Sequence, residues 1–141
     1  MKLATRKAVG TGAQRRLQLQ SARASAPALR ERLPQVATLR FELRFEVPDG
    51  RTPSPQQHTL YPAARAFFRF ACPCSECDGD FDLGPAVLAL VGGLSESRRA
   101  ETGAVSGRMP CEGWRARDLA GGRPCTSVLD YRLSAGVAGP D

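Results

Sequence analysis

Three of the five cysteines in this sequence fall within six residues of one another, at Cys72, Cys74 and Cys77, and the other two follow at Cys111 and Cys125. Thiolate sulfur is a soft ligand, and zinc binds four such ligands in a tetrahedron that has no vacant position when the metal is structural. We therefore predict that four of the five thiolates bind one structural Zn²⁺ ion.

The spacing leaves open which cysteine is the spare. Cys74 and Cys77 have the C-x-x-C spacing of a zinc knuckle, whereas Cys72 and Cys77 form a wider pair with four residues between them. Either pair can supply two ligands from one loop. The ligand set is therefore Cys77, Cys111 and Cys125 with one more, and Cys72 or Cys74 is the spare.

Cysteine usage and hydropathy together predict a cytoplasmic protein with no membrane partner. An odd count of five cysteines suits metal ligands better than a disulfide framework. Charged or polar residues interrupt every window before Ala37, so the apolar centre of a secretory signal is missing. The longest apolar run, from Pro85 to Leu94, is half of the roughly 20 residues that a membrane helix needs.

The net charge of +6 is concentrated at the N-terminus. Residues 1–35 carry eight basic side chains against the single acid Glu31, whereas residues 36–141 carry 12 basic and 13 acidic ones. We predict a basic, mostly disordered tail over residues 1–35, a zinc-binding domain over 36–136 and a frayed end over 137–141. A short helix over residues 26–33 would end before Pro34.

Strict alternation marks the first strand, residues 36–47, in which charged residues separate Leu39, Phe41, Leu43, Phe45 and Val47. Residues 58–61 and 65–71, bent at Pro62, are the predicted antiparallel partner. A helix is expected from Pro85 to about Arg99, capped by an acid or by Gly84. Two further strands are expected over residues 104–111 and 125–135.

These elements predict an α+β fold, an antiparallel four-stranded β-β-α-β-β sheet with one helix and the zinc site at one end. The second strand would deliver Cys72 to Cys77 at one edge of the sheet, and the helix would return the chain to the other edge. The third strand would then end at Cys111 and the fourth would begin at Cys125, at the same edge as the first cysteines. All five cysteines are therefore expected to meet.

The residues C-P-C-S-E-C at 72–77, and C-E-G at 111–113 with a later cysteine at 125, resemble the zinc-ribbon class of small bacterial domains. The resemblance covers about Phe67 to Tyr131. It departs from the usual ribbon in the long run from Glu112 to Pro124 and in the helix that divides the two halves. It implies a structural metal and, in many ribbons, contact with nucleic acid.

Three functions remain open. The preferred one is a zinc-stabilised binding or adaptor domain whose partner is a protein or a larger assembly, with no enzymatic activity. The second is RNA or DNA binding through the arginine-rich tail and the 112–124 loop, whose contact residues would be Trp114, Arg115, Arg117 and Arg123. The third is a thiol oxidoreductase that uses Cys74 and Cys77, although the aspartates that follow oppose thiolate formation.

A catalytic zinc would need an open position beside a general base. Glu76 and Glu112 are neighbours of predicted ligands, but charged residues in such places are usually only solvated. His58, the single histidine, is distant in sequence from the cysteines. The sequence therefore favours a structural metal over a catalytic one.

Overall fold

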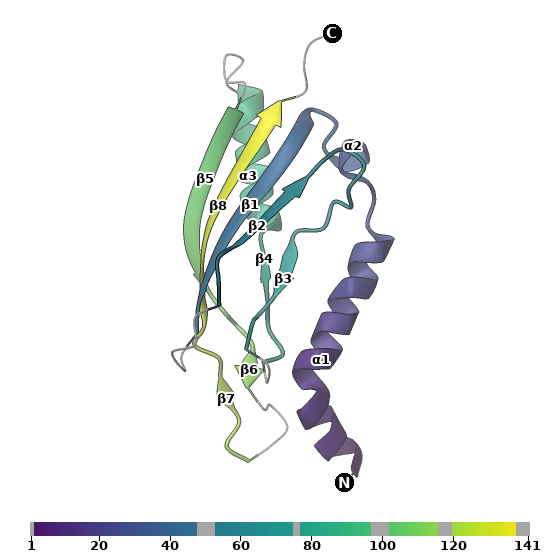
Figure 1. Ribbon diagram of the computed structural model, residues 1–141, viewed down its shortest axis with the longest axis vertical. Coiled ribbons are helices and arrows are strands. Elements are labelled where there is room, and N and C mark those ends of the chain that lie inside the picture. The colour runs from purple at the N-terminus through teal and green to yellow at the C-terminus, as the bar shows by residue number, and fades with distance from the viewer. Residues whose placement is uncertain (1, 48–52, 75–76, 97–101, 116–119, 138–141) are drawn as a thin grey trace.

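The computed structural model describes residues 2–47, 53–74, 77–96, 102–115 and 120–137. Its main sheet has four strands, β1 (Val36–Glu46), β2 (Gln56–Leu60), β5 (Thr102–Pro110) and β8 (Val128–Val137), in the order β2-β1-β8-β5 (Figure 1). Every neighbouring pair is antiparallel. The predicted α+β class and the four-stranded antiparallel sheet are confirmed.

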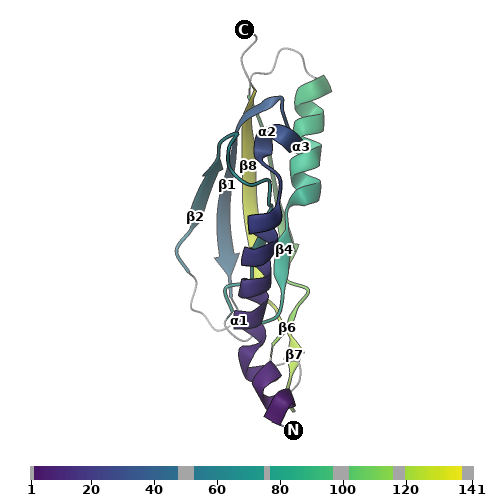
Figure 2. The same cartoon turned by 90° about the vertical axis from the view of Figure 1, so that its right-hand side faces the viewer.

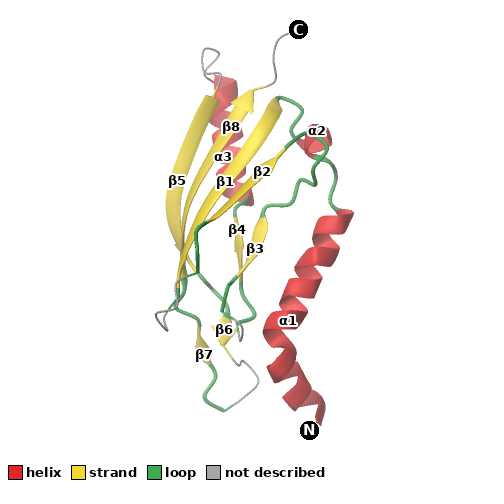
Figure 3. Ribbon diagram, in the orientation of Figure 1, coloured by secondary structure: helices red, strands yellow, loops and turns green. Residues whose placement is uncertain are grey.

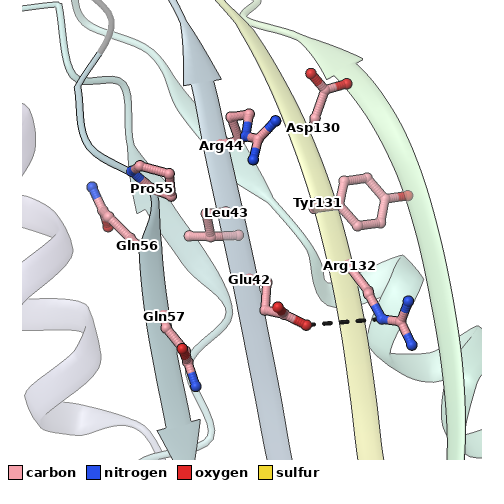
Figure 4. Close-up of a pocket in the computed structure, with 9 residues that line it drawn as sticks. All are labelled: Glu42, Leu43, Arg44, Pro55, Gln56, Gln57, Asp130, Tyr131 and Arg132. Atoms are coloured by element: carbon pink, nitrogen blue, oxygen red, sulfur yellow. Dashed lines mark ion pairs between the residues drawn. The ribbon is translucent and has the colours of Figure 1, made fainter.

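Strand β1 is the centre of the sheet and has the predicted alternation. Its inner side chains are almost fully buried, and the residues between them are exposed: Leu39, Phe41, Leu43 and Phe45 alternate with Arg40, Glu42, Arg44 and Glu46. The outer face carries charged pairs such as Glu42 with Arg132, 3.8 Å apart (Figure 4). One face of the sheet is therefore solvated, and the other face must be covered.

A second layer covers the inner face. It consists of helix α3 (Gly84–Glu96) and a two-stranded unit of β3 (Arg69–Ala71) and β4 (Asp80–Asp82) (Figure 2). The ring centroids of Phe41 and Phe70 are 5.3 Å apart, and those of Phe45 and Phe81 are 5.6 Å apart. The hydrophobic core lies between these two layers.

The predicted second strand is divided in the structure. Residues 56–60 pair with β1 as β2, whereas residues 69–71 form β3 and pair with β4 in a separate small sheet. Both edges of β1 are already occupied by β2 and β8, and Pro62 has no N–H to continue a ladder. The chain between β2 and β3 is consequently a loop (Figure 3).

The structure has three helices in its described residues, and the sequence predicted two of them, α2 and α3. Residues 2–25, expected to be disordered, form helix α1 (Lys2–Ser25), and α2 (Leu29–Arg32) is the short helix expected before Pro34. Alanine, arginine, glutamine and leucine, which dominate α1, have high helix propensity. Arg15 of α1 pairs with Asp80, and Leu19 is buried. Two further core residues, Leu29 and Leu33, also precede residue 36.

Helix α3 begins as predicted. The carboxylate of Asp82 accepts a hydrogen bond of 2.9 Å from the N–H of Gly84, which satisfies one of the free amides of the first turn. The end of the predicted helix, residues 97–99, lies outside the described residues, as do residues 138–141 of the predicted frayed end, whereas Val137 is the last residue of β8. Within the described part of the chain, no helix is both long and apolar enough to cross a membrane.

The pairing register of β1 can be tested with two neighbouring residues on opposite faces. Phe45→Ala should lower the free energy of unfolding by about 3–5 kcal/mol, because it leaves a cavity against Phe81. Arg44→Ala, on the exposed face, should change it by less than about 0.5 kcal/mol. Urea denaturation of both variants measures this difference, and similar losses for the two would contradict the register.

Candidate metal centre

Four of the five cysteines meet at the end of the sheet where β5 ends and β8 begins. The Sγ atoms of Cys72, Cys77, Cys111 and Cys125 all lie within 4.8 Å of one another, and all four side chains are buried. Cys74 is partly exposed and is not in this group. The predicted convergence of distant cysteines is confirmed for four of the five, and the cluster could hold a metal ion.

The small β3–β4 unit supplies the first two sulfurs. Cys72 directly follows β3, and its N–H donates to the carbonyl of Gly79 across the turn, at 3.2 Å. Cys77 donates its N–H to the carbonyl of Cys74, also at 3.2 Å, and forms an isolated bridge with Arg115. The turn that contains Cys74 therefore presents Cys72 and Cys77 on the same side.

The main sheet supplies the other two sulfurs. Cys111 follows β5, and its N–H donates to the carbonyl of Ser127 at 2.8 Å, which continues the pairing of β5 with β8. Cys125 donates its N–H to the carbonyl of Gly113 at 2.9 Å, and its Sγ lies 3.2 Å from the Oγ of the buried Ser127. The positions of both sulfurs are set by the backbone ladder of the sheet.

Two turns with the same sequence pattern each contain one cysteine of the cluster. The sequence cysteine, acid, glycine occurs at residues 77–79 and again at 111–113. In each turn the glycine N–H points at the sulfur two residues before it, at 3.2 Å from Gly79 to Cys77 and at 3.4 Å from Gly113 to Cys111. Hydrogen bonds from backbone amides favour the charged thiolate.

The two turns pack against each other through their glycines. A Cβ atom on Gly79 would lie 2.5 Å from the Sγ of Cys111 and 3.0 Å from the backbone of Gly113, and a Cβ on Gly113 would overlap the backbone of Gly79. No other residue type permits this approach. The glycines were not among the predicted site residues, although the repeated cysteine-acid-glycine pattern could have pointed to them.

Two of the six sulfur separations are close to those of a tetrahedral zinc site, and all six are within 4.8 Å. The Sγ atoms of Cys72 and Cys125 are 3.8 Å apart, and those of Cys77 and Cys111 are 3.5 Å apart. Four sulfurs at about 2.3 Å from one zinc ion stand about 3.8 Å from one another in a regular tetrahedron. A disulfide needs about 2.05 Å, so these cysteines are not bonded in pairs.

Four thiols this close cannot all ionise unless a cation is present. Hydrogen bonds from Cys111 and then Cys77 lower the pKa of Cys72 to about 2, so one thiolate is stabilised by its neighbours. The pKa of Cys77 is raised, first by its hydrogen bond with Cys111 and then by that with Cys72. A divalent cation would replace these shared protons and compensate half of the charge of four thiolates.

The predicted contact residues lie beside the cluster. Strand β6 (Trp114–Arg115) pairs with β7 (Arg123–Pro124), and this hairpin separates Cys111 from Cys125. Trp114 is 38% exposed, and its backbone N–H donates to the Asp78 carboxylate at 2.8 Å. Arg117 and Glu76 lie outside the described residues. Glu112 is exposed next to Cys111.

Comparison with known proteins finds no family model, no curated protein and no solved structure that matches this chain. The likeness to zinc ribbons therefore stays a resemblance of motif, carried by the cysteines and by the two cysteine-acid-glycine turns.

Proposed function

We propose that the cluster is a structural zinc site in a small binding or adaptor domain that acts through contacts with a protein or an assembly. One observation carries the proposal, the grouping of four buried Sγ atoms within 4.8 Å. An all-sulfur set of four is the usual structural zinc site, because it leaves no position for a substrate or an activated water. The ligands would be Cys72, Cys77, Cys111 and Cys125, with Cys74 as the spare.

Zinc would join the two layers of the fold. Cys72 and Cys125 are 53 residues apart in the sequence, and they belong to the β3–β4 unit and to the main sheet respectively. In zinc-finger peptides such ligation supplies on the order of 10 kcal/mol or more toward folding. Metal binding would therefore fix the short strands, which have few ladder hydrogen bonds of their own.

The β6–β7 hairpin is the proposed contact surface. It extends beyond the end of the main sheet (Figure 1) and carries the partly exposed Trp114 and the exposed Arg123. Tryptophan and arginine are the residue types that most often dominate protein interfaces. Because Cys111 and Cys125 flank this hairpin, the metal would hold its two ends in place.

Helix α1 supports nucleic-acid binding as a second candidate. Its 24 residues include six cations and no acid: Lys2, Arg6, Lys7, Arg15, Arg16 and Arg23. If this candidate is correct, the full chain should shift RNA or DNA in a mobility-shift assay, with an affinity that falls steeply with salt. Replacing Lys2, Arg6, Lys7 and Arg16 by Gln should then abolish the shift, whereas no shift by the natural chain would remove the candidate.

The zinc proposal predicts one zinc ion per chain by native mass spectrometry. Cys72→Ser should lose the metal, because it removes one of the four buried sulfurs, whereas Cys74→Ser should keep it. The two substituted cysteines lie two residues apart in the sequence, so the variants are matched controls for each other. Retention of zinc by Cys72→Ser, or its absence from the natural protein, would show that the proposed ligand set is incorrect.

The close packing of the two cysteine-acid-glycine turns can be tested separately. Gly79→Ala should weaken zinc binding at least about tenfold and lower the free energy of unfolding by about 1–3 kcal/mol, because the added Cβ meets the Cys111 sulfur. The control is Gly92→Ala in α3, where the added Cβ meets nothing within 4 Å and should stabilise the helix by about 0.5–1 kcal/mol. Competition with a chromogenic chelator measures the zinc affinity of each variant.

Unchanged zinc affinity in Gly79→Ala would contradict this description of the site. Because Gly92 lies in the helix and not at the cluster, a loss of affinity in both variants would indicate general unfolding.

A further inference from the structure

A second site lies between helix α1, strand β2 and the chain that leads into β3. It is a pocket of about 270 Å³, and no cysteine is among its lining residues. Its walls are mainly hydrocarbon and come from three elements and a loop: Phe41, Leu60, Phe67 and Phe70. The pocket is large enough for a small molecule with one or two rings, and too small for a folded partner.

The wall formed by residues 64–67 is held in place by backbone pairing. Leu29 donates its N–H to the carbonyl of Ala64 at 2.7 Å, and Ala66 donates its N–H to the carbonyl of Pro27, also at 2.7 Å. Leu29 itself is fully buried in the core. This wall is therefore tied to the segment between α1 and α2, and the pocket is preformed.

Two arginines provide the charge of the pocket. The Arg23 guanidinium lies 5.2 Å from the centroid of the Phe67 ring, and Arg65 donates one N–H to the carbonyl of Ala26 at 2.8 Å. Neither arginine has an ion pair with an acid in the described structure, and none of the described lining residues is Asp or Glu. The pocket thus combines apolar walls with an uncompensated positive charge.

His58 also lines this apolar, positively charged pocket. Its ring lies 5.3 Å from the centroid of Phe70, and its Nε2 is 3.0 Å from the Oε1 of Gln56. Burial, and then the positive charge of Arg23, lower the pKa of this imidazole. The lowered pKa favours the neutral imidazole, which adds an aromatic wall to the pocket, while the positive charge stays on the two arginines.

A larger pocket lies on the outer face of the sheet, and its charges, unlike those of the pocket beside α1, are of both signs. It has a volume of about 390 Å³ and is lined by charges of both signs over β1, β2 and β8 (Figure 4). Glu42 and Arg132 pair with each other, and Asp130 pairs with Arg108. These pairs largely neutralise one another, so this surface has no comparable preference for an anion.

We propose that the pocket between α1 and β2 binds a small organic anion with an apolar body, of the aryl carboxylate class. The phenylalanine rings would cover the apolar body, and the guanidinium groups of Arg23 and Arg65 would bind the carboxylate, since planar carboxylate and guanidinium groups match in shape and charge. This site uses no metal ligand, so its test is independent of the zinc proposal.

The test titrates 2-naphthoate into the full-length protein as purified, whatever its metal content, and measures affinity by calorimetry. The neutral probe 2-naphthamide has the same ring system and controls for burial of the apolar body alone. Naphthoate should bind at least about tenfold more tightly than the amide, because charge-assisted hydrogen bonds exceed neutral ones. Equal affinities for the two probes, or no binding of naphthoate at millimolar concentration, would overturn the proposal.

Arginine variants locate the anion. Arg23→Gln should weaken naphthoate binding about tenfold and leave the affinity for the amide unchanged, whereas Arg30→Gln, on the exposed face of α2, should change neither. Arg65→Gln should also weaken naphthoate, but it removes the hydrogen bond to Ala26 as well, so its melting temperature must be measured alongside. Unchanged naphthoate affinity in Arg23→Gln would show that the site is not this pocket.

Discussion

The structure depends on the charge of four sulfur atoms that the backbone brings together. Cys72, Cys77, Cys111 and Cys125 come from segments far apart in the sequence, yet their Sγ atoms lie within 4.8 Å in a buried site. Without a cation, the four thiols must share protons, because neighbouring negative charges repel one another. Through the hydrogen bonds that share these protons, first those with Cys111, the pKa of Cys72 is lowered and that of Cys77 is raised. A bound metal would reduce this repulsion, and its binding free energy would stabilise every segment that ends at the cluster.

Regular structure determines where each sulfur lies. Strands β5 and β8 run antiparallel with Pro110 opposite Val128, so the residues just beyond them, Cys111 and Ser127, stay paired. The β3–β4 unit reaches the same place from the inner layer of the fold, where Phe70 and Phe81 pack on the main sheet. Aromatic packing and sheet register thus locate the centre before any metal is considered, which lowers the entropy cost of ligation.

Much of this could be predicted from the sequence, because the strongest signals are periodic. The alternation over residues 36–47 identified β1 and its buried face, and the positions of the later strands placed Cys111 and Cys125 at one end of the sheet. The path of the chain to Cys72 was harder to predict. The sequence does not show that β8 pairs with the second edge of β1, which leaves no edge of β1 for the segment before Cys72. Helix α1 was missed because its composition resembles that of a disordered tail, although its individual residues have high helix propensity.

The spare cysteine shows what spacing alone cannot decide. Cys74 and Cys77 match the knuckle spacing, but the turn that they close directs Cys77 toward the cluster and leaves Cys74 outside it. The wider pair of Cys72 and Cys77 spans the β3–β4 turn, and in that arrangement both sulfurs lie on its inner side. Which cysteines join the cluster therefore follows the hairpin geometry and not the shortest sequence interval. The same geometry couples the β6–β7 hairpin to the sulfur cluster, since that hairpin is attached to the fold at Cys111 and Cys125.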